Sequence, residues 1–214
     1  KKFNSRYKYL EDNDLIKKTA NLLSEKKVIG WFQDKMEFGP RALGSRSIIA
    51  DPRDEFMQKK INMKIKYREG FRPFAPIVLE DYVKNFFDIE SISPYMLLVG
   101  QVKDNEKFKG NLDKFIGFEK LKNIKSSIPA VTHVNYSARI QTVSQSQNPK
   151  IYNLIQEFHK ITNVPILVNT SFNIKDEPIV ESPNDAFRCF MASGLDYMVC
   201  GNFLLKKDEQ YNDW

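Results

Sequence analysis

The sequence predicts an α/β (α+β) protein with a twisted mixed sheet flanked by helices. Short apolar runs bounded by glycine, proline and polar residues are typical of buried strands, and apolar residues at three- to four-residue spacing are typical of amphipathic helices. Both kinds of segment interleave along the 214 residues, which is the pattern of α/β and α+β folds. With 42% hydrophobic residues, the chain can bury one sizeable core.

In the first half, apolar stripes predict helices and continuous apolar runs predict strands. Asn13 or Asp14 is expected to cap the first helix, and Pro52 to favour entry into the second. The expected elements are a helix at 13–26, strands at 28–32 and 47–50, a helix at 54–65, a strand at 74–79, a helical turn at 81–87 and a strand at 95–102.

In the second half, residues 103–128 are rich in Lys, Asn, Asp and Gly, have no period, and are predicted to be a surface loop or insertion. Ser182 is expected to cap the last helix, and Gly194 to follow its end. The expected elements are extended segments at 129–133 and 139–144, a helix at 149–162, a strand at 165–168, a helix at 183–193 and strands at 196–200 and 203–205.

Composition narrows the class of protein. There is no signal peptide and no apolar run near the ~18 residues that a membrane span needs. Cys189 and Cys200 form no CxxC pair, so both are expected to be small buried residues in a reducing compartment, and the protein to be cytoplasmic. Because the chain begins at Lys1 without a Met, we expect one domain, 1–214, of a longer protein.

Positive charge is concentrated in one part of the chain. Residues 35–72 hold ten basic and five acidic residues, which is +5 of the formal net charge of +6. Lys59, Lys60 and Lys64 fit a solvated helix face. The arginines and Lys66 flank Gly- and Pro-rich turns instead, where charge is more often directed at a partner.

The first candidate site is the glycine-rich turn that follows the strand at 28–32. Gly39 and Gly44 allow a tight turn whose backbone N–H groups can approach an anion, and Arg41 and Arg46 add planar cations suited to phosphate. The Lys-Ser/Thr pair of a P-loop is absent, which excludes a Walker-type nucleotide site. A structural turn whose arginines form ion pairs is an equally good interpretation.

Three further polar groups flank predicted strands. Lys66 and Arg72 stand in a basic turn before an apolar strand, where a half-buried arginine needs a carboxylate or a ligand as its partner. The segment 132–139 includes His133, a general base or a structural residue, and too few histidines are present for a histidine metal site. The segment 169–173 follows a buried strand, where it could bind phosphate or form an Asx or Ser/Thr turn.

Together and in this order, these groups resemble the C-terminal domain of the O-carbamoyltransferases that act on nodulation factors, antibiotics and other glycans. The resemblance spans residues 14–205. The motifs that carry it are Gly30-Trp31-Phe32-Gln33, Met36-Glu37-Phe38-Gly39-Pro40-Arg41-Ala42-Leu43-Gly44, Arg46-Ser47-Ile48, Asp51-Pro52-Arg53, Arg72-Pro73-Phe74-Ala75-Pro76, Arg139-Ile140-Gln141-Thr142-Val143 and Asn169-Thr170-Ser171-Phe172-Asn173.

The resemblance implies a YrdC-like fold and a half-reaction. In the family this domain makes carbamoyl-adenylate from carbamoyl phosphate and ATP, with Mg²⁺ sharing the charge. A separate N-terminal domain with an actin-like ATPase fold and a bound metal then transfers the carbamoyl group to a sugar hydroxyl. That partner domain is expected to be absent from these residues.

The resemblance also implies roles for individual residues. Lys66 and Arg72 are expected to hold carbamoyl phosphate, with Arg41 bridging to ATP. The residues expected to contact ATP are Arg139, Asn169 and Ser171 at its phosphates, Arg46 in the glycine-rich turn, and the main chain of Thr132, His133 and Val134 at its adenine.

Three alternatives remain open. A nucleic-acid-binding module suits the net charge, because YrdC-like domains elsewhere act on tRNA, but the charges gather at turns rather than along a face, which makes nucleic acid a less favoured partner. A non-catalytic scaffold for the N-terminal domain is disfavoured by the full set of polar residues. Threonylcarbamoyl-adenylate synthesis on tRNA is disfavoured by the Glu37–Gly44 motif, which resembles the glycan and antibiotic branch.

Overall fold

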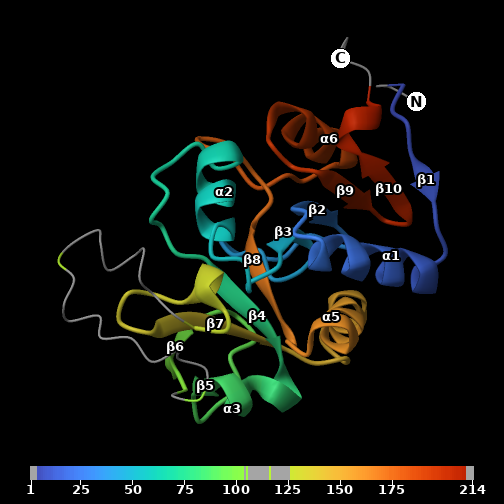
Figure 1. Ribbon diagram of the computed structural model, residues 1–214. Helices are drawn as coiled ribbons and strands as arrows, with labels where there is room; N and C mark the ends of the chain where they lie inside the picture. The colour runs from blue at the N-terminus through green and yellow to red at the C-terminus, as the bar shows by residue number, and fades with distance from the viewer. Residues whose placement is uncertain (1–3, 104, 106–115, 117–125, 211–214) are drawn as a thin grey trace.

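The structure, a computed structural model, describes residues 4–103, 105, 116 and 126–210 (Figure 1). The predicted loop at 103–128 therefore lies almost entirely outside the described residues. In the part that is described, ten strands form one mixed sheet in the order β1-β10-β9-β2-β3-β8-β4-β7-β6-β5. The strands are β1 (Lys8–Tyr9), β2 (Ile29–Phe32), β3 (Arg46–Ala50), β4 (Ala75–Leu79), β5 (Phe87–Asp88), β6 (Leu98–Val102), β7 (Ser137–Val143), β8 (Ile166–Ser171), β9 (Tyr197–Cys200) and β10 (Phe203–Lys206).

Helices cover both sides of this sheet. Figure 1 shows α2 and α6 above it and α1 and α5 below, with α3 at the β5 end. Their bounds are α1 (Asp12–Ser24), α2 (Met57–Lys64), α3 (Val83–Phe86), α5 (Pro149–Thr162) and α6 (Pro183–Ala192), with 3-10 turns at η1 (Glu80–Tyr82), η4 (Pro129–Val131) and η5 (Lys207–Glu209). The predicted α/β class and the mixed sheet flanked by helices are confirmed.

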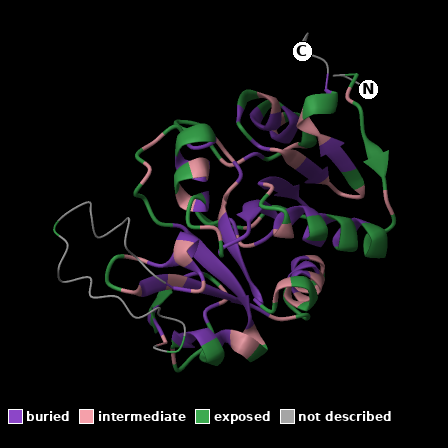
Figure 2. Cartoon of the chain, in the orientation of Figure 1, coloured by how far each residue is buried: buried purple, intermediate pink, exposed green. Residues whose placement is uncertain are grey.

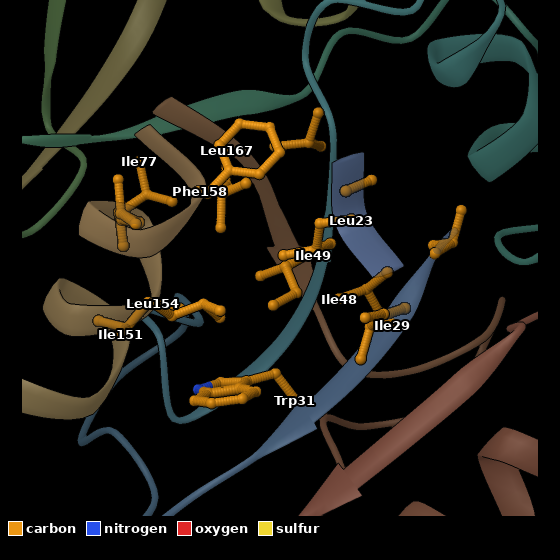
Figure 3. Packing of buried hydrophobic residues seen from close by; sticks show 14 of the residues in the cluster. Leu23, Ile29, Trp31, Ile48, Ile49, Ile77, Ile151, Leu154, Phe158 and Leu167 are labelled. Atoms are coloured by element: carbon orange, nitrogen blue, oxygen red, sulfur yellow. The ribbon is translucent and has the colours of Figure 1, made fainter. Parts of the chain in front are cut away.

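The core joins α5 and α1 to the central strands. Ile151, Leu154 and Phe158 of α5 pack with Trp31 of β2 and Ile49 of β3, and all five side chains are fully buried (Figure 3). Figure 2 shows the same central strands as continuously buried, as expected for strands covered on both faces. Burial of these aliphatic and aromatic side chains, at about 1.5–3 kcal/mol each, holds the sheet that positions the polar turns.

Helix boundaries follow local hydrogen bonds. The helix at 149–162 is found as predicted, and Ser182 caps α6 in a reciprocal capping box with Asp185. α2 starts at Met57 rather than Asp54, because the Asp54 carboxylate accepts the Phe56 N–H and its carbonyl accepts the Met57 N–H, which makes a turn first. α1 begins at Asp12 after Glu11, so the expected cap at Asn13 or Asp14 was wrong.

The extended segment expected at 129–133 was also wrong in part. Pro129–Val131 forms the 3-10 turn η4. The Thr132 N–H donates to the Pro129 carbonyl, and the Thr132 hydroxyl donates to the Ile128 carbonyl. These bonds tighten the segment into a turn, and Pro129 suits its first position because proline has no N–H to leave unpaired there.

Strand directions bring the polar turns to one edge of the sheet. β2 and β8 run antiparallel to β3, β8 runs antiparallel to β4, and β4 runs parallel to β7. The carboxyl ends of β2 and β8 therefore meet the amino ends of β3, β4 and β7. All four polar groups singled out in the sequence lie at these strand ends.

Candidate functional site

Lys66 stands at the centre of this edge. It follows α2, is 5% exposed, and its Nζ lies against the turn that leaves β8. Nζ is 2.6 Å from the Ser171 carbonyl oxygen and 3.2 Å from Ser171 Oγ. It is 2.7 Å from Asn173 Oδ1 and 2.9 Å from the Asn173 carbonyl oxygen. An ammonium has three protons to donate, so four neutral oxygens satisfy it fully.

The environment of Lys66 lowers the affinity of its amine for a proton. Burial, reinforced by the nearby charge of Arg68, lowers the pKa of the Lys66 amine to about 7. None of its four oxygen partners is a carboxylate, and a buried cation without a counter-ion is costly. An anion that approaches Lys66 would supply the missing negative charge.

A hollow of about 400 Å³ opens beside Lys66. Four cationic side chains line it: Lys66, Arg68, Arg72 and Lys175. Its other lining residues are Tyr67, Glu69, Ser171, Asn173, Ile174 and Asp176. The excess of cations over carboxylates makes this hollow suitable for a multiply charged anion.

The arginines of the hollow are held differently. Arg68 Nε donates to Asn62 Oδ1 at 2.7 Å, and Asn62 Nδ2 donates to the Arg72 carbonyl at 2.7 Å, so buried Asn62 fixes the turn. Arg72 Nε lies 3.2 Å from Glu69 Oε2, and both side chains are 55% exposed. Arg72 is therefore at the rim of the hollow rather than drawn into the core.

The sequence analysis missed Arg68 and Asn173 as site residues. The signals were present: Arg68 is two residues from Lys66, and Asn173 is two residues from Ser171. Ser171 Oγ donates to Asn173 Oδ1 at 2.7 Å, which completes a ring of hydrogen bonds with Lys66. These bonds bring Lys66 against the 169–173 segment.

A second cationic group is formed by Arg41 and Arg139, with His133 beside Arg139. The pKa of Arg139 is lowered by its burial and then by the charge of Arg41, and that of His133 is lowered by its burial and then by Arg139. Arg139 is thus close enough to both Arg41 and His133 to disfavour further positive charge. Among the described residues, no carboxylate pairs with Arg41 or Arg139, which leaves both guanidinium groups suited to an anionic ligand.

The segment before β7 offers little side-chain chemistry. Thr132 is buried and its hydroxyl is bonded to Ile128 and Ser126. The His133 N–H donates to the Ser137 carbonyl, and its own carbonyl accepts from Tyr136. Val134 is 39% exposed, and no described residue bonds its main chain. Of the three residues expected at adenine, Val134 has the most accessible main chain.

The glycine-rich turn does not present its N–H groups to solvent. One carboxylate oxygen, Glu37 Oε1, accepts from Leu43 N at 2.7 Å, Ser45 N at 2.7 Å and Arg46 N at 3.3 Å. The Gly44 N–H donates to Ser47 Oγ at 3.0 Å. For these four N–H groups the structural-turn interpretation agrees with the geometry, because Glu37 and Ser47 accept them within the fold.

Gly44 is required by the shape of this turn. Its φ is +110°, and a Cβ there would lie 3.0 Å from Ile151 Cγ2 of α5. Any other residue would be strained and crowded at once.

Arg46 is a buried structural cation in this turn. Its NH1 donates to the Gln33 and Ser45 carbonyls, and its NH2 donates to the Asp34 carbonyl. The guanidinium stacks 3.5 Å from the centre of the Phe32 ring. Arg46 therefore lies apart from the two cationic groups, and its bonds hold the end of β2 to the start of β3.

Asn169 connects the two cationic groups. It is 1% exposed on β8, two residues before Ser171, so both side chains project from one face. Asn169 Nδ2 donates to the Ala42 carbonyl at 3.0 Å and to Gln141 Oε1 at 2.6 Å, while Oδ1 accepts nothing from the described part of the chain. The Asn169 amide protons are thus used within the fold, and a contact of Asn169 with the ATP phosphates stays a prediction.

The other features of the described residues do not form a second candidate catalytic or metal site. A cavity of about 1010 Å³ is lined by Met36, Gly39, residues 177–181 and part of α6. Cys189 is buried and Cys200 half-buried, both as thiols. No group of three or more His, Cys, Asp or Glu side chains that could hold a metal occurs in this part of the chain. No helix found there has the length and apolar character needed to cross a membrane.

A mixed sheet with cationic turns at one edge defines an α/β protein with a candidate site for an anion. The family model described as Carbamoyltransferase C-terminus matches residues 20–207. The chain therefore belongs to the carbamoyltransferase family, in its C-terminal part, and the resemblance inferred from the motifs is confirmed.

Relatives agree with this assignment. The chain is 50% identical over 206 residues to an uncharacterised Synechocystis protein, sll1178, covering 95% of this chain and 34% of that protein. It is 41% identical over 206 residues to nodulation protein NolO of Bradyrhizobium diazoefficiens, covering 94% and 34%. It is 34% identical over 193 residues to nodulation protein U of Rhizobium tropici, covering 90% and 30%. The chain thus spans about one third of the length of these relatives.

A solved structure shares the fold. Full-length HypF, in a phosphate- and nucleotide-bound form, matches with a TM-score of 0.55 and 17% identity, over 97% of this chain and 23% of HypF. At that identity the likeness concerns the fold alone.

Proposed function

We propose that this domain makes carbamoyl-adenylate from carbamoyl phosphate and ATP. The observation that carries the proposal is the pair of cationic groups, Lys66/Arg68/Arg72 and Arg41/Arg139, at one edge of one sheet. Both proposed substrates are multiply anionic. Two cationic groups joined by Asn169 and Ser171 suit two phosphorylated molecules that must meet.

The chemistry needs positioning more than a nucleophile from the protein. Water cleaves carbamoyl phosphate to carbamate and phosphate; a carbamate oxygen then attacks the α-phosphorus of ATP, and pyrophosphate leaves with the bond's electron pair. Negative charge moves onto pyrophosphate, and fixed cations stabilise it without reorganising. This accounts for a site rich in Lys and Arg and without a catalytic triad.

The residues have separate tasks in this proposal. Lys66 and Arg72, with Arg68, hold carbamoyl phosphate in the hollow, and Lys66 exchanges one of its oxygen partners for the anion. Arg139 and the Ser171 hydroxyl contact the ATP phosphates, Arg41 bridges the two substrates, and the main chain at Val134 meets the adenine. Mg²⁺ supplies further charge neutralisation when bound, with ligands mainly from phosphates and water.

The longer relatives suggest the fate of the product. A nodulation protein of the same family is about three times the length of this chain. We propose that an additional N-terminal domain, with an actin-like ATPase fold, passes the carbamoyl group to a hydroxyl of a glycan or antibiotic. The phosphate and nucleotide bound to HypF agree with the two anions required here.

The test is to incubate the domain with ATP, Mg²⁺ and carbamoyl phosphate and to follow pyrophosphate and carbamoyl-adenylate by mass spectrometry. We expect product that depends on carbamoyl phosphate and falls by about 100-fold or more in Arg72→Ala, the loss typical of one transition-state donor. Lys160→Ala is the matched control, because Lys160 and Glu157 also form an i,i+3 ion pair, on α5. Unchanged product in Arg72→Ala would refute the role of Arg72, and absence of ATP binding would refute the function.

A further inference from the structure

We propose that Gln141 is a positioning residue that sets the place of Arg41 relative to Arg139. The inference rests on the proposed function, because it assumes that these two arginines bind the substrates' phosphates. Gln141 is 2% exposed on β7 and touches no part of the hollow beside Lys66. Its effect on a ligand must therefore pass through other residues.

Gln141 ties the glycine-rich turn to the sheet. Its Nε2 donates to the Leu43 carbonyl at 2.8 Å, and its Oε1 accepts from Asn169 Nδ2 at 2.6 Å. Asn169 Nδ2 donates in turn to the Ala42 carbonyl at 3.0 Å. The Asn169 and Gln141 amides thus hold the carbonyl groups of Ala42 and Leu43, the two residues that directly follow Arg41.

These contacts fix the orientation of both amides. The Leu43 carbonyl can only accept, so it must face the Gln141 nitrogen, and Gln141 Oε1 must then face the Asn169 nitrogen. Reversal of either amide would place two acceptors together. The arrangement has a single low-energy state, which is what a positioning device requires.

The same strand carries the second arginine. Arg139 and Gln141 are two residues apart on β7 and project from one face. β7 therefore supplies Arg139 and also Gln141, whose hydrogen bond to the Leu43 carbonyl positions Arg41. Because Arg41 and Arg139 repel each other, as the lowered pKa of Arg139 reflects, some fixed contact must oppose their separation.

The turn is held from its other side by Glu37. Its carboxylate binds the N–H groups of Leu43, Ser45 and Arg46, so the Leu43 peptide is fixed through its N–H by Glu37 and through its carbonyl by Gln141. Glu37 belongs to the turn itself and fixes its internal shape. Gln141 is what fixes the turn's place on the sheet.

The experiment is a double-mutant cycle on the 214-residue chain, with Mg²⁺-ATP titrated calorimetrically into the wild type, Arg41→Ala, Gln141→Leu and the double variant. We expect each single variant to bind ATP about tenfold more weakly, as for loss of one charge-assisted contact, and the double variant to bind no more weakly than Arg41→Ala. Non-additivity of this kind is the readout that a merely structural role would not give.

Thr142→Val is the matched control. Thr142 is the next residue of β7, 1% exposed on the opposite face, and its hydroxyl accepts the Ser93 N–H at 2.9 Å. Its replacement removes a buried hydrogen bond of similar kind without touching the turn. We expect a lower melting temperature and unchanged ATP affinity.

Gln141→Glu serves if Gln141→Leu does not fold. It keeps the acceptor for Asn169 and loses only the donor to Leu43, and protonation of the introduced carboxylate would restore that donor. We expect weakened ATP binding at about pH 8 that recovers toward the wild-type value near pH 5, where a buried carboxyl group is protonated.

The outcomes separate the two proposals. Loss of affinity in Arg41→Ala with full affinity in Gln141→Leu, or additive losses in the double variant, overturns the positioning role alone. Equal ATP affinity in Arg41→Ala and wild type overturns the proposed task of Arg41, and with it this inference.

Discussion

The glycine-rich turn at 37–46 and the basic turn at 66–73 lie at the same edge of the sheet and use their polar groups in opposite ways. In the first, Glu37 and Ser47 take up the backbone N–H groups. In the second, Lys66, Arg68 and Arg72 line a hollow of about 400 Å³ with Lys175. A turn rich in Gly and Arg can therefore be internally satisfied, while a turn with one glycine leaves its cations facing a hollow.

The difference lies in where the counter-charge is found. Glu37 lies within the first turn and neutralises its dipoles. The second turn has Glu69, which is exposed and pairs with Arg72 at the rim, so buried Lys66 has only neutral partners. Removal of Glu37 from the first turn should therefore mainly lower stability, and removal of Lys66 from the second should mainly lower ligand affinity.

The largest effect on stability is expected for Glu37→Ala. Three backbone N–H groups lose a charged acceptor, and the free energy of unfolding should fall by about 3 kcal/mol or more, since hydrogen bonds to charged groups contribute about 1.5–3 kcal/mol each. Urea unfolding measures it. Glu37→Gln keeps one acceptor oxygen and should lose less; equal stability of all three proteins would mean that the carboxylate does not hold the turn.

Lys66→Met is expected to lower ligand affinity much more than the free energy of unfolding. Affinity for Mg²⁺-ATP with carbamoyl phosphate should fall about 100-fold, while the free energy of unfolding changes by less than about 1.5 kcal/mol, because relief of a buried charge offsets the lost hydrogen bonds. Calorimetric titration and urea unfolding give the two numbers. Lys59→Met, on the exposed face of α2, is the control, and a large stability loss without an affinity loss would make Lys66 structural.

The two turns also show how far the sequence leads. The motifs were enough to pick out four polar groups, and the spacing of Ile151, Leu154, Ile155 and Phe158 predicted α5 correctly. Their meeting at one edge was not predicted, because it depends on the strand directions. The sequence did not indicate that Glu37 would occupy the N–H groups of its own turn, since such competition depends on the final backbone path. Asn173 was missed because its partner Lys66 is distant in sequence, whereas Arg68, bonded to nearby Asn62, was overlooked beside Lys66.

The change of anion affinity with pH is expected to be smaller than the effects of Glu37→Ala and Lys66→Met. The pKa of Lys66 is lowered from its ordinary 10.5 to about 7, so the empty site loses this charge as pH rises through 7. An anion binds the protonated form, and the affinity for sulfate, which does not itself titrate here, should fall about tenfold per pH unit between about pH 8 and 9. The lowered pKa of His133 keeps it neutral in that range.

The free energy of unfolding should rise with pH, whereas the sulfate affinity falls. Between about 7 and 10.5 the unfolded chain binds a proton at Lys66 that the folded chain does not, so the contribution of Lys66 to the free energy of unfolding rises with pH across that window. Lys66→Met should abolish the pH dependence of sulfate affinity in this range and reduce the slope of stability with pH, to which Lys207, with a pKa lowered to about 8, also contributes. A sulfate affinity independent of pH in the wild type would contradict the lowered pKa.

The smallest effect is expected for Glu69→Ala. The Arg72–Glu69 pair is 55% exposed on both sides, and exposed pairs contribute about 0–1 kcal/mol, so stability should change by less than about 1 kcal/mol. Removal of the one carboxylate bonded to Arg72 should raise sulfate affinity by about threefold at low salt, and the gain should fade as salt screens the rim. Glu157→Ala, which removes the corresponding carboxylate on α5, should leave sulfate affinity unchanged. A loss of affinity in Glu69→Ala would mean that Glu69 orients Arg72 toward the anion, and the second turn would then hold its cation by an internal carboxylate as the first turn holds its N–H groups.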